Sequence, residues 1–489
     1  MSSPAPPLPP LAWLCQRIQK RHLVFACLFL FLLYGSFRQR FVWGVDSFGY
    51  FQQGKLYSEG RLYLPLPQDP AGQPALVPLG FSQDPAGRII PNYPPGFPLL
   101  LALGHWLRAP TWVPPLVGVL SCLILFALLR ERVGREAALL FTAAWAFMPL
   151  TVYGSTMLMS DLAAATVLLG AWLAFRRGRS ALAAWLFALC FAVRPTNVLF
   201  LLPFLLVLRP DRATGRLVLH LLLPCALYGF YNLFLYGAPW RTGYGNIFSS
   251  MSAAVFPSHL AFFATGTLAI LSPVVVGLAL IGLFPWNREK TFLLLWPVVF
   301  MLFYSFWAGG GIDRWWWARF ILPGYAALFI LAADGYQSTA RWLSGPGATR
   351  WSRTGALVLA LLTLSLPAYY IKYGYIQGDL WLHDKGVASR QLVREVAAFA
   401  PKGSLVGSIE HTSSFLLYTD LVPFVANHPQ APDLVARALA EGRRVFLVPE
   451  PWSASDPANL AFSRRFAVRE VARCHSPWNL LPVYELSAR

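Results

Sequence analysis

Charged residues are scarce in this chain of 489 residues, because Asp, Glu, Lys and Arg together make up only 13% of it. Average soluble domains carry roughly 25% charged residues, so a wholly soluble protein is excluded. The mean hydropathy is +0.50 and 56% of the residues are hydrophobic. The same composition excludes a disordered chain, apart from the proline-rich start at 2–10.

Paired cysteines and nucleotide-binding motifs are also missing. The six cysteines include no CxxC pair. Only Cys474 lies in the region 373–489, so that region cannot hold a disulfide bond of its own. The sequence contains no Walker A loop, no dinucleotide glycine fingerprint and no HExxH motif. The energy for any group transfer must therefore arrive with an already activated substrate.

Long apolar runs are what the sequence contains instead. Runs near the ~20-residue length of a transmembrane helix recur through residues 22–372. We predict eleven membrane-spanning helices, near 22–37, 112–129, 137–153, 160–175, 181–194, 196–208, 217–236, 259–284, 291–307, 319–333 and 354–370. Residues 181–208, counted here as two spans, could instead form one broken pair of helices. The run at 94–107 is shorter, about 14 residues, which suits a juxtamembrane or re-entrant helix better than a crossing.

The net charge of +18 sets the orientation. Basic residues concentrate at alternate ends of the apolar runs, as the positive-inside rule requires, so a nucleic-acid partner is not expected. This places segment 1–21 in the cytoplasm, and the loop 38–93 and region 373–489 outside it. No small-residue cleavage site follows the first apolar run, so we predict an uncleaved first helix. A bacterial inner membrane is favoured, because Ser487-Ala-Arg489 is no retention signal.

Region 373–489 changes character and is predicted to be a small extracytoplasmic α/β domain. We expect helices at 387–399 and 433–440, and strands at 404–409, 444–448, 466–471 and 481–486. In the loop 38–93, Gln-Asp-Pro-Ala-Gly occurs at 68–72 and again at 83–87. Asp-Pro-Ala-Gly is typical of a type I turn, and each copy is interpreted as a turn.

Two acidic residues stand in apolar or aromatic surroundings, where an ionised side chain normally has a partner or a role. Asp46, in Trp43-Gly-Val-Asp-Ser-Phe-Gly-Tyr50, could act as a general base or simply cap the helix that follows. Asp161 begins a span, where a carboxylate also satisfies the free N–H groups of a helix terminus. For both residues the functional and the structural interpretation stay open.

Two arginines and one histidine complete the candidates. Arg194 precedes Pro195, which should break the helix. A buried arginine at such a break could bind an anionic phosphate or form a salt bridge to Asp161. Arg319 follows a triple tryptophan typical of the membrane interface, and a lipid-phosphate contact is plausible for it. His259 follows an outer loop and is the one histidine considered near a site. Glu410-His411 is expected to end a strand and to be structural.

Together these motifs resemble a known family. The motifs that carry this resemblance are Val45-Asp46-Ser-Phe-Gly-Tyr50, Asn92-Tyr-Pro-Pro-Gly-Phe-Pro98, Ser160-Asp161, Arg194-Pro195 and Arg319-Phe-Ile-Leu-Pro323. They are similar to motifs of the GT-C glycosyltransferases, and more narrowly of the protein O-mannosyltransferase and aminoarabinose-transferase superfamily. The similarity covers roughly residues 22–335.

The resemblance implies a fold and a reaction. The fold is a polytopic α-helical membrane domain at 22–372, with first outer loop 38–93 and juxtamembrane helix 94–107. The reaction moves a sugar from a polyprenyl-phosphate donor to an acceptor hydroxyl on the outer face, with inversion. Asp46 would be the base, Arg194 and Arg319 would hold the lipid phosphate, and Asp161 would position the acceptor, Asp46 or a basic partner. The remaining predicted substrate-binding residues are Tyr50, Tyr93 and His259.

One departure from the family concerns metal. Many members have Asp-Glu where this chain has Asp46-Ser47, so a divalent metal requirement stays open. The acceptor, whether a lipid, a glycan or a protein, stays open as well. Two alternatives to a transferase remain: a transporter or flippase of lipid-linked saccharides, and a non-catalytic subunit of an envelope-assembly complex. The transporter alternative predicts repeat symmetry, which the sequence does not show.

Overall fold

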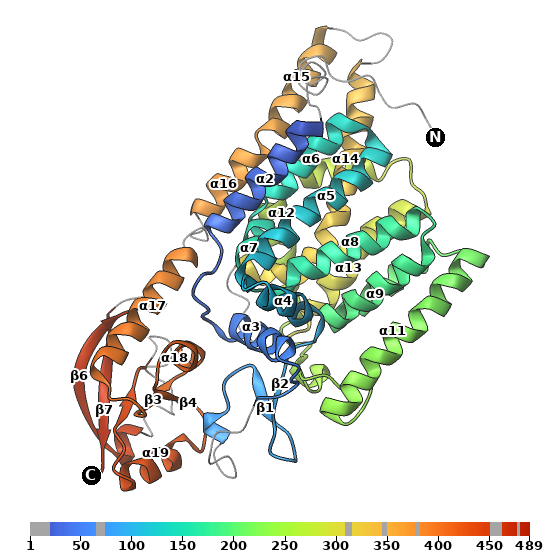
Figure 1. Ribbon diagram of the computed structural model, residues 1–489. Helices are drawn as coiled ribbons and strands as arrows, with labels where there is room; N and C mark the ends of the chain where they lie inside the picture. Colours follow the sequence, from blue (N-terminus) through green and yellow to red (C-terminus); the bar gives the residue numbers. More distant parts are fainter. Residues whose placement is uncertain are drawn as a thin grey trace. The chain divides into compact units, whose positions relative to one another are not determined.

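The computed structural model describes residues 20–64, 74–308, 315–344, 350–376, 382–449, 462–476 and 480–489. The chain divides into two compact units. The helical unit comprises residues 1–38, 112–231 and 245–380, and the mixed unit comprises residues 39–111, 232–244 and 381–489. Figure 1 shows both along the chain.

The helical unit holds most of the α-helices. They are α2 (Lys20–Ser36), α5 (Val113–Val133), α6 (Arg135–Phe147), α7 (Pro149–Thr156), α8 (Ser160–Arg176), α9 (Ser180–Val193), α10 (Leu201–Phe204), most of α11 (Arg212–Tyr236), α12 (Phe256–Gly282), α13 (Arg288–Ser305), α14 (Leu322–Ser344), α15 (Arg350–Leu364) and α16 (Leu366–Ile376). Short 3-10 turns lie between some of them, including η3 (Pro195–Phe200) and η5 (Trp315–Ile321).

The chain is an integral, multi-pass membrane protein. Among the described residues, five helical segments are long and apolar enough to cross a bilayer, and a sixth crossing results if the bent pair α6 and α7 forms one span. That pair bends by 61° where Pro149 follows the end of α6, because proline cannot continue the hydrogen-bond ladder of the preceding helix. The predicted span 137–153 is therefore a broken helix. The total of eleven crossings remains a prediction.

Helices α12 and α14 approach each other through two glycines. A Cβ atom on Gly282 would lie 1.9 Å from the backbone oxygen of Leu331, and one on Gly335 would lie 1.9 Å from that of Leu278. Only glycine permits such a backbone approach, and small residues serve this purpose between membrane helices. Arg132 adds a polar link, because it binds Asp334 of α14 at 2.7 Å and thereby ties α5 to α14.

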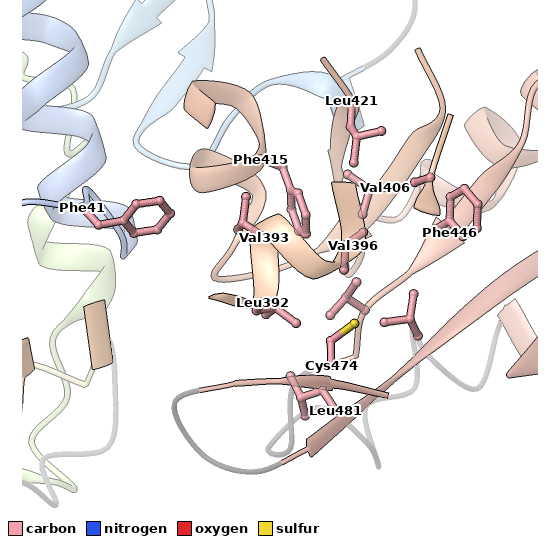
Figure 2. Close-up of a cluster of buried hydrophobic side chains, with 13 residues drawn as sticks. Phe41, Leu392, Val393, Val396, Val406, Phe415, Leu421, Phe446, Cys474 and Leu481 are labelled. Carbon is pink, nitrogen blue, oxygen red and sulfur yellow. The ribbon is translucent and has the colours of Figure 1, made fainter. Parts of the chain in front are cut away.

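The mixed unit contains a five-stranded sheet in the order β4-β3-β5-β7-β6. The strands are β3 (Leu405–Ser408), β4 (Val422–Val425), β5 (Val445–Leu447), β6 (Ala467–His475) and β7 (Leu480–Ser487). Strand β3 is parallel to both β4 and β5, whereas β7 is antiparallel to β5 and β6. Three helices pack against the sheet: α17 (Leu382–Phe399) contacts β6, α18 (Thr412–Tyr418) contacts β4, and α19 (Ala431–Ala440) contacts β5. One apolar core of this unit is drawn in Figure 2.

The mixed unit also contains the first loop. Helix α3 (Val45–Ser58) carries Asp46 and packs on α4 (Gly96–Trp106), which occupies the predicted juxtamembrane helix 94–107. Between them, β1 (Phe81–Gln83) and β2 (Ile89–Pro91) form an antiparallel hairpin. Its turn is the second Gln-Asp-Pro-Ala-Gly copy: the N–H of Gly87 donates to the carbonyl of Asp84 at 2.9 Å, which confirms the predicted turn. The first copy, at 68–72, lies outside the described residues.

Two sequence expectations for region 373–489 need correction. The strand predicted at 404–409 ends at Ser408, so Glu410-His411 lies in the link to α18 and not at a strand end. The sequence pattern predicts neither α18 nor β4. Both are short, seven and four residues, and a segment that short shows too little periodicity to be distinguished from a loop.

Candidate functional site

The candidate residues fall into two polar clusters, one in each compact unit. The Asp46 cluster, in the mixed unit, consists of Asp46, Tyr50, Tyr93 and Tyr244. The Asp161 cluster, in the helical unit, consists of Asp161, Arg194, Arg319, Tyr153 and Tyr304.

Asp46 is held at the start of α3. Gly44 is the N-cap, so Asp46 lies in the first turn, where a carboxylate is stabilised by the helix dipole. Its half-buried side chain accepts a hydrogen bond of 2.8 Å from the hydroxyl of Tyr93 to Oδ1. Gly44 occupies the N-cap position itself, so any structural role of Asp46 at this helix start is exerted from inside the first turn.

Two further tyrosines pack beside Tyr93, the residue that contacts this carboxylate. The rings of Tyr50 and Tyr93 lie 4.4 Å apart between centroids, and the hydroxyls of Tyr50 and Tyr244 lie 3.4 Å apart. The carbonyl of Tyr93 accepts a hydrogen bond of 2.9 Å from Gln53 of α3. Tyr50 and Tyr93 are buried, so their rings and hydroxyl groups form a compact polar and aromatic cluster around the start of α3.

Gly49 makes the contact between Tyr93 and α3 possible. A Cβ atom on Gly49 would lie 2.0 Å from Cε2 of Tyr93, closer than atoms can approach. The glycine in Asp46-Ser-Phe-Gly-Tyr50 therefore leaves the space that the Tyr93 ring fills. In the sequence this glycine is one position of a motif, and its role follows only from the folded structure. Tyr244 was also missed as a member of the cluster, because its proximity arises only in the folded unit.

Asp161 is buried between two arginines. It is 3% exposed and begins α8. It forms an ion pair with Arg194, as the structural interpretation of Arg194 predicted, and its Oδ2 lies 3.8 Å from Nε of Arg319. The three side chains carry a formal charge of +1 together. A buried site with excess positive charge is suited to an anionic ligand.

Arg194 lies where the chain changes from α9 to η3. The helix ends at Val193 and Arg194 is extended (φ −153°, ψ 106°), which confirms that Pro195 breaks the helix. The guanidinium of Arg194 donates to the hydroxyl of Tyr304 at 3.2 Å and lies 4.8 Å from the centroid of the Phe320 ring. These contacts fix the orientation of the planar guanidinium group.

Arg319 lies in η5 and is 8% exposed. Its Nη1 donates to the hydroxyl of Tyr153 at 3.0 Å. The sequence analysis did not select Tyr153 or Tyr304, although a tyrosine inside an apolar span needs a partner for its hydroxyl, which is the signal that could have found them.

His259 does not join either cluster through a described contact. It lies in the first turn of α12, and within the described ranges its buried Nδ1 has no hydrogen-bond partner. The described residues also contain no group of three His, Cys, Asp or Glu side chains that could hold a metal ion.

Neither protein-family models nor curated protein sequences match this chain. Solved structures do. The structure of ArnT, an aminoarabinose transferase from Cupriavidus metallidurans, bound to undecaprenyl phosphate matches with a TM-score of 0.59 at 16% identity, over 95% of this chain and 97% of that chain. The chain has the fold of a GT-C glycosyltransferase.

Two further GT-C structures agree with this fold. ArnT from the same organism in the apo state gives a TM-score of 0.56 at 15% identity, again over 95% of this chain and 97% of that chain. The arabinofuranosyltransferase AftD from Mycobacteria gives a TM-score of 0.50 at 16% identity. That match covers 96% of this chain but only 40% of AftD. At these identities the likeness establishes the GT-C fold, which confirms the resemblance inferred from the motifs.

Proposed function

We propose that this protein is a polyprenyl-phosphate-sugar-dependent glycosyltransferase that works on the extracytoplasmic face of a bacterial inner membrane. The observation that carries the proposal is the Asp161 cluster, a buried site with two arginines and one carboxylate inside a chain of GT-C fold. A membrane protein retains such charges against a cost of about 2.5–3.5 kcal/mol each at mid-bilayer, and an anionic lipid head group explains them. One GT-C neighbour, ArnT, has been solved with undecaprenyl phosphate bound.

In this reaction the acceptor hydroxyl attacks the anomeric carbon of the donor. Asp46 takes the hydroxyl proton, the acceptor oxygen forms the new bond to the anomeric carbon, and the bond from that carbon to the phosphate oxygen breaks on the opposite face. The configuration inverts, and polyprenyl phosphate leaves with the electron pair. Asp46 is the base because it is a half-buried carboxylate at a helix start, among aromatic and hydroxyl groups suited to a sugar.

The arginines stabilise the leaving group. The donor phosphodiester has one negative charge, and the phosphomonoester that leaves has up to two. Arg194 and Arg319 therefore bind the leaving group more strongly than the donor, and such a difference accelerates a reaction. Asp161 holds Arg194 in place and limits the net charge of the cluster to +1. Tyr50 and Tyr93 contact the sugar or the acceptor. His259, in the first turn of α12 beside the outer loop, also contacts the substrate.

The proposal is tested with the full chain in liposomes. A panel of undecaprenyl-phosphate monosaccharides is presented with lipid, glycan and peptide acceptors, with and without Mg²⁺ or Mn²⁺, and undecaprenyl phosphate is quantified by mass spectrometry. We expect one donor to be consumed with one acceptor class, and the product to carry the opposite anomeric configuration. Movement of a labelled donor across the bilayer without release of undecaprenyl phosphate would instead identify a transporter.

A further inference from the structure

The segment that precedes Asp46 is bound to the C-terminal part of the same compact unit. Val42, which is 1% exposed, uses both of its backbone groups in this contact. Its N–H donates to the hydroxyl oxygen of Tyr418 at 2.9 Å, and its carbonyl accepts from the hydroxyl of Ser414 at 3.2 Å. Ser414 and Tyr418 are four residues apart on α18, so they lie on the same side of this helix. Two polar contacts thus fix one residue of the first loop.

Apolar contacts reinforce the two hydrogen bonds. The ring of Phe41 stacks on that of Tyr418, with 4.2 Å between centroids. Phe41 also belongs to the apolar core formed by α17, α18 and the sheet, which includes Val393 and Phe415 (Figure 2). Its neighbour Trp43 is partly buried and packs against the same core. The segment from Phe41 to Trp43 is therefore part of the buried core of the α/β region.

Only three residues separate Val42, which we call the anchor of α3, from Asp46, the candidate base. One of them is Gly44, whose φ of 79° and ψ of 149° are accessible mainly to glycine. The carbonyl of Gly44 accepts the first hydrogen bond of α3, from the N–H of Phe48 at 3.1 Å. A displacement of Val42 is therefore transmitted through this fixed link to the first turn of α3, where Asp46 lies.

We propose that Tyr418 and Ser414 of the C-terminal α/β region are positioning residues for Asp46, which they act on through the backbone of Val42. This inference rests on the proposed function, because it assigns the α/β region a part in the placement of the catalytic base. It also explains why a transferase would keep such a region beside its first loop: the region orients the base towards the acceptor hydroxyl and does not itself contact the reacting atoms.

The kinetic test uses the full chain with two variants and two matched controls. Tyr418→Phe and Ser414→Ala each remove one hydrogen bond to Val42, whereas Ser413→Ala removes a neighbouring buried hydroxyl that has no hydrogen-bond partner among the described residues. Tyr484→Phe removes a tyrosine hydroxyl from β7. We expect kcat to fall about tenfold for each positioning variant, with the KM for the lipid donor unchanged, and both controls to stay within twofold of the wild type.

The variants are then combined with Asp46→Asn. If Tyr418 acts through Asp46, Tyr418→Phe lowers the residual activity of the Asp46→Asn protein by less than twofold. A further tenfold loss in that background would mean that Tyr418 supports the fold in general, and it would overturn the proposal. Equal losses in the controls would overturn it in the same way.

Hydrogen exchange of the full chain separates failure of this inference from failure of the proposed function. We expect Tyr418→Phe to accelerate amide exchange several-fold in peptides that cover residues 42–48, and Ser413→Ala to leave it unchanged. Unchanged exchange in the Tyr418→Phe protein would overturn the positioning role, whatever the activity. A fully active Asp46→Asn variant would instead refute Asp46 as the base. If exchange is nevertheless accelerated in the Tyr418→Phe protein, Val42 still holds the start of α3 in place.

Discussion

The hydroxyl of Tyr93 donates a hydrogen bond of 2.8 Å to Oδ1 of Asp46. The bond joins two residues that the sequence places in different motifs, and it gives the carboxylate of the candidate base a fixed orientation. A base must face the proton that it abstracts, so the loss of this bond should reduce the rate of the chemical step.

We therefore predict that Tyr93→Phe lowers kcat about tenfold, as expected for a hydrogen bond to a charged group, and leaves the protein folded. Initial rates of undecaprenyl phosphate release measure this effect. Tyr63→Phe is the control, because Tyr63 is an exposed tyrosine of the same loop. Equal rates for Tyr93→Phe and the wild type would show that Tyr93 does not orient the base.

Gly49 gives a second test of the same contact. Because a Cβ atom at this position would overlap the Tyr93 ring, Gly49→Ala should push the ring away from Asp46 and lower kcat at least as much as Tyr93→Phe. Gly60→Ala serves as a comparison for loss of a glycine, since no atom lies near its Cβ position, although its positive φ adds backbone strain. A Gly49→Ala protein with the activity of the wild type would contradict the role of this glycine.

The ion pair of Asp161 predicts coupled effects on stability. Asp161→Asn leaves two arginines without their carboxylate in a buried site, and breaking a buried pair costs about 3–5 kcal/mol. We expect the Asp161→Asn/Arg194→Gln double variant to recover part of this loss, because it removes one of the two uncompensated charges. Thermal unfolding in detergent compares the wild type, Asp161→Asn, Arg194→Gln and the double variant. If the double variant loses the sum of both single losses, the two residues are not coupled.

His411 predicts the pH dependence of the α/β region. It is 1% exposed, and burial lowers the pKa of its imidazole to about 4 from the usual value near 6.5. The folded state therefore keeps His411 neutral between these values, whereas the unfolded state binds a proton there. The stability contributed by neutral His411 is complete above pH 6.5 and decreases as the pH falls towards 4, by about 3 kcal/mol at most.

Hydrogen exchange of the amides in β3 and β4, corrected for the intrinsic pH dependence of exchange, measures this loss. We expect protection to decrease between pH 6.5 and 4 in the wild type and to change less in His411→Phe, which has no titrating group at this position. The same pH dependence in both proteins would assign the effect to other groups.

Some contacts of the candidate site were predicted from the sequence alone, and others were not. The pairing of Asp161 with Arg194 was foreseen, because a charge in apolar surroundings requires a partner and Pro195 marked the break beside Arg194. The contacts of Tyr93 with Asp46 and of Tyr418 with Val42 were not foreseen. Residues 42 and 418 are far apart in the chain, and their contact depends on the packing of α18, a helix too short to leave a periodic pattern. The GT-C fold was foreseen from motifs of low individual specificity and was confirmed by solved structures at 15–16% identity.

The measurement that tests the central claim most directly is mass spectrometry of polyprenyl-phosphate sugars and envelope glycans from cells. It compares the wild type, a deletion, Asp46→Asn and the control Glu59→Gln, all at equal membrane abundance. Loss of a general base slows a reaction about 10²–10⁴-fold. If Asp46 is the base, the deletion and Asp46→Asn accumulate the same lipid-linked monosaccharide and lose the same glycan, while Glu59→Gln matches the wild type. A wild-type pattern for Asp46→Asn beside a defective deletion would contradict this role of Asp46.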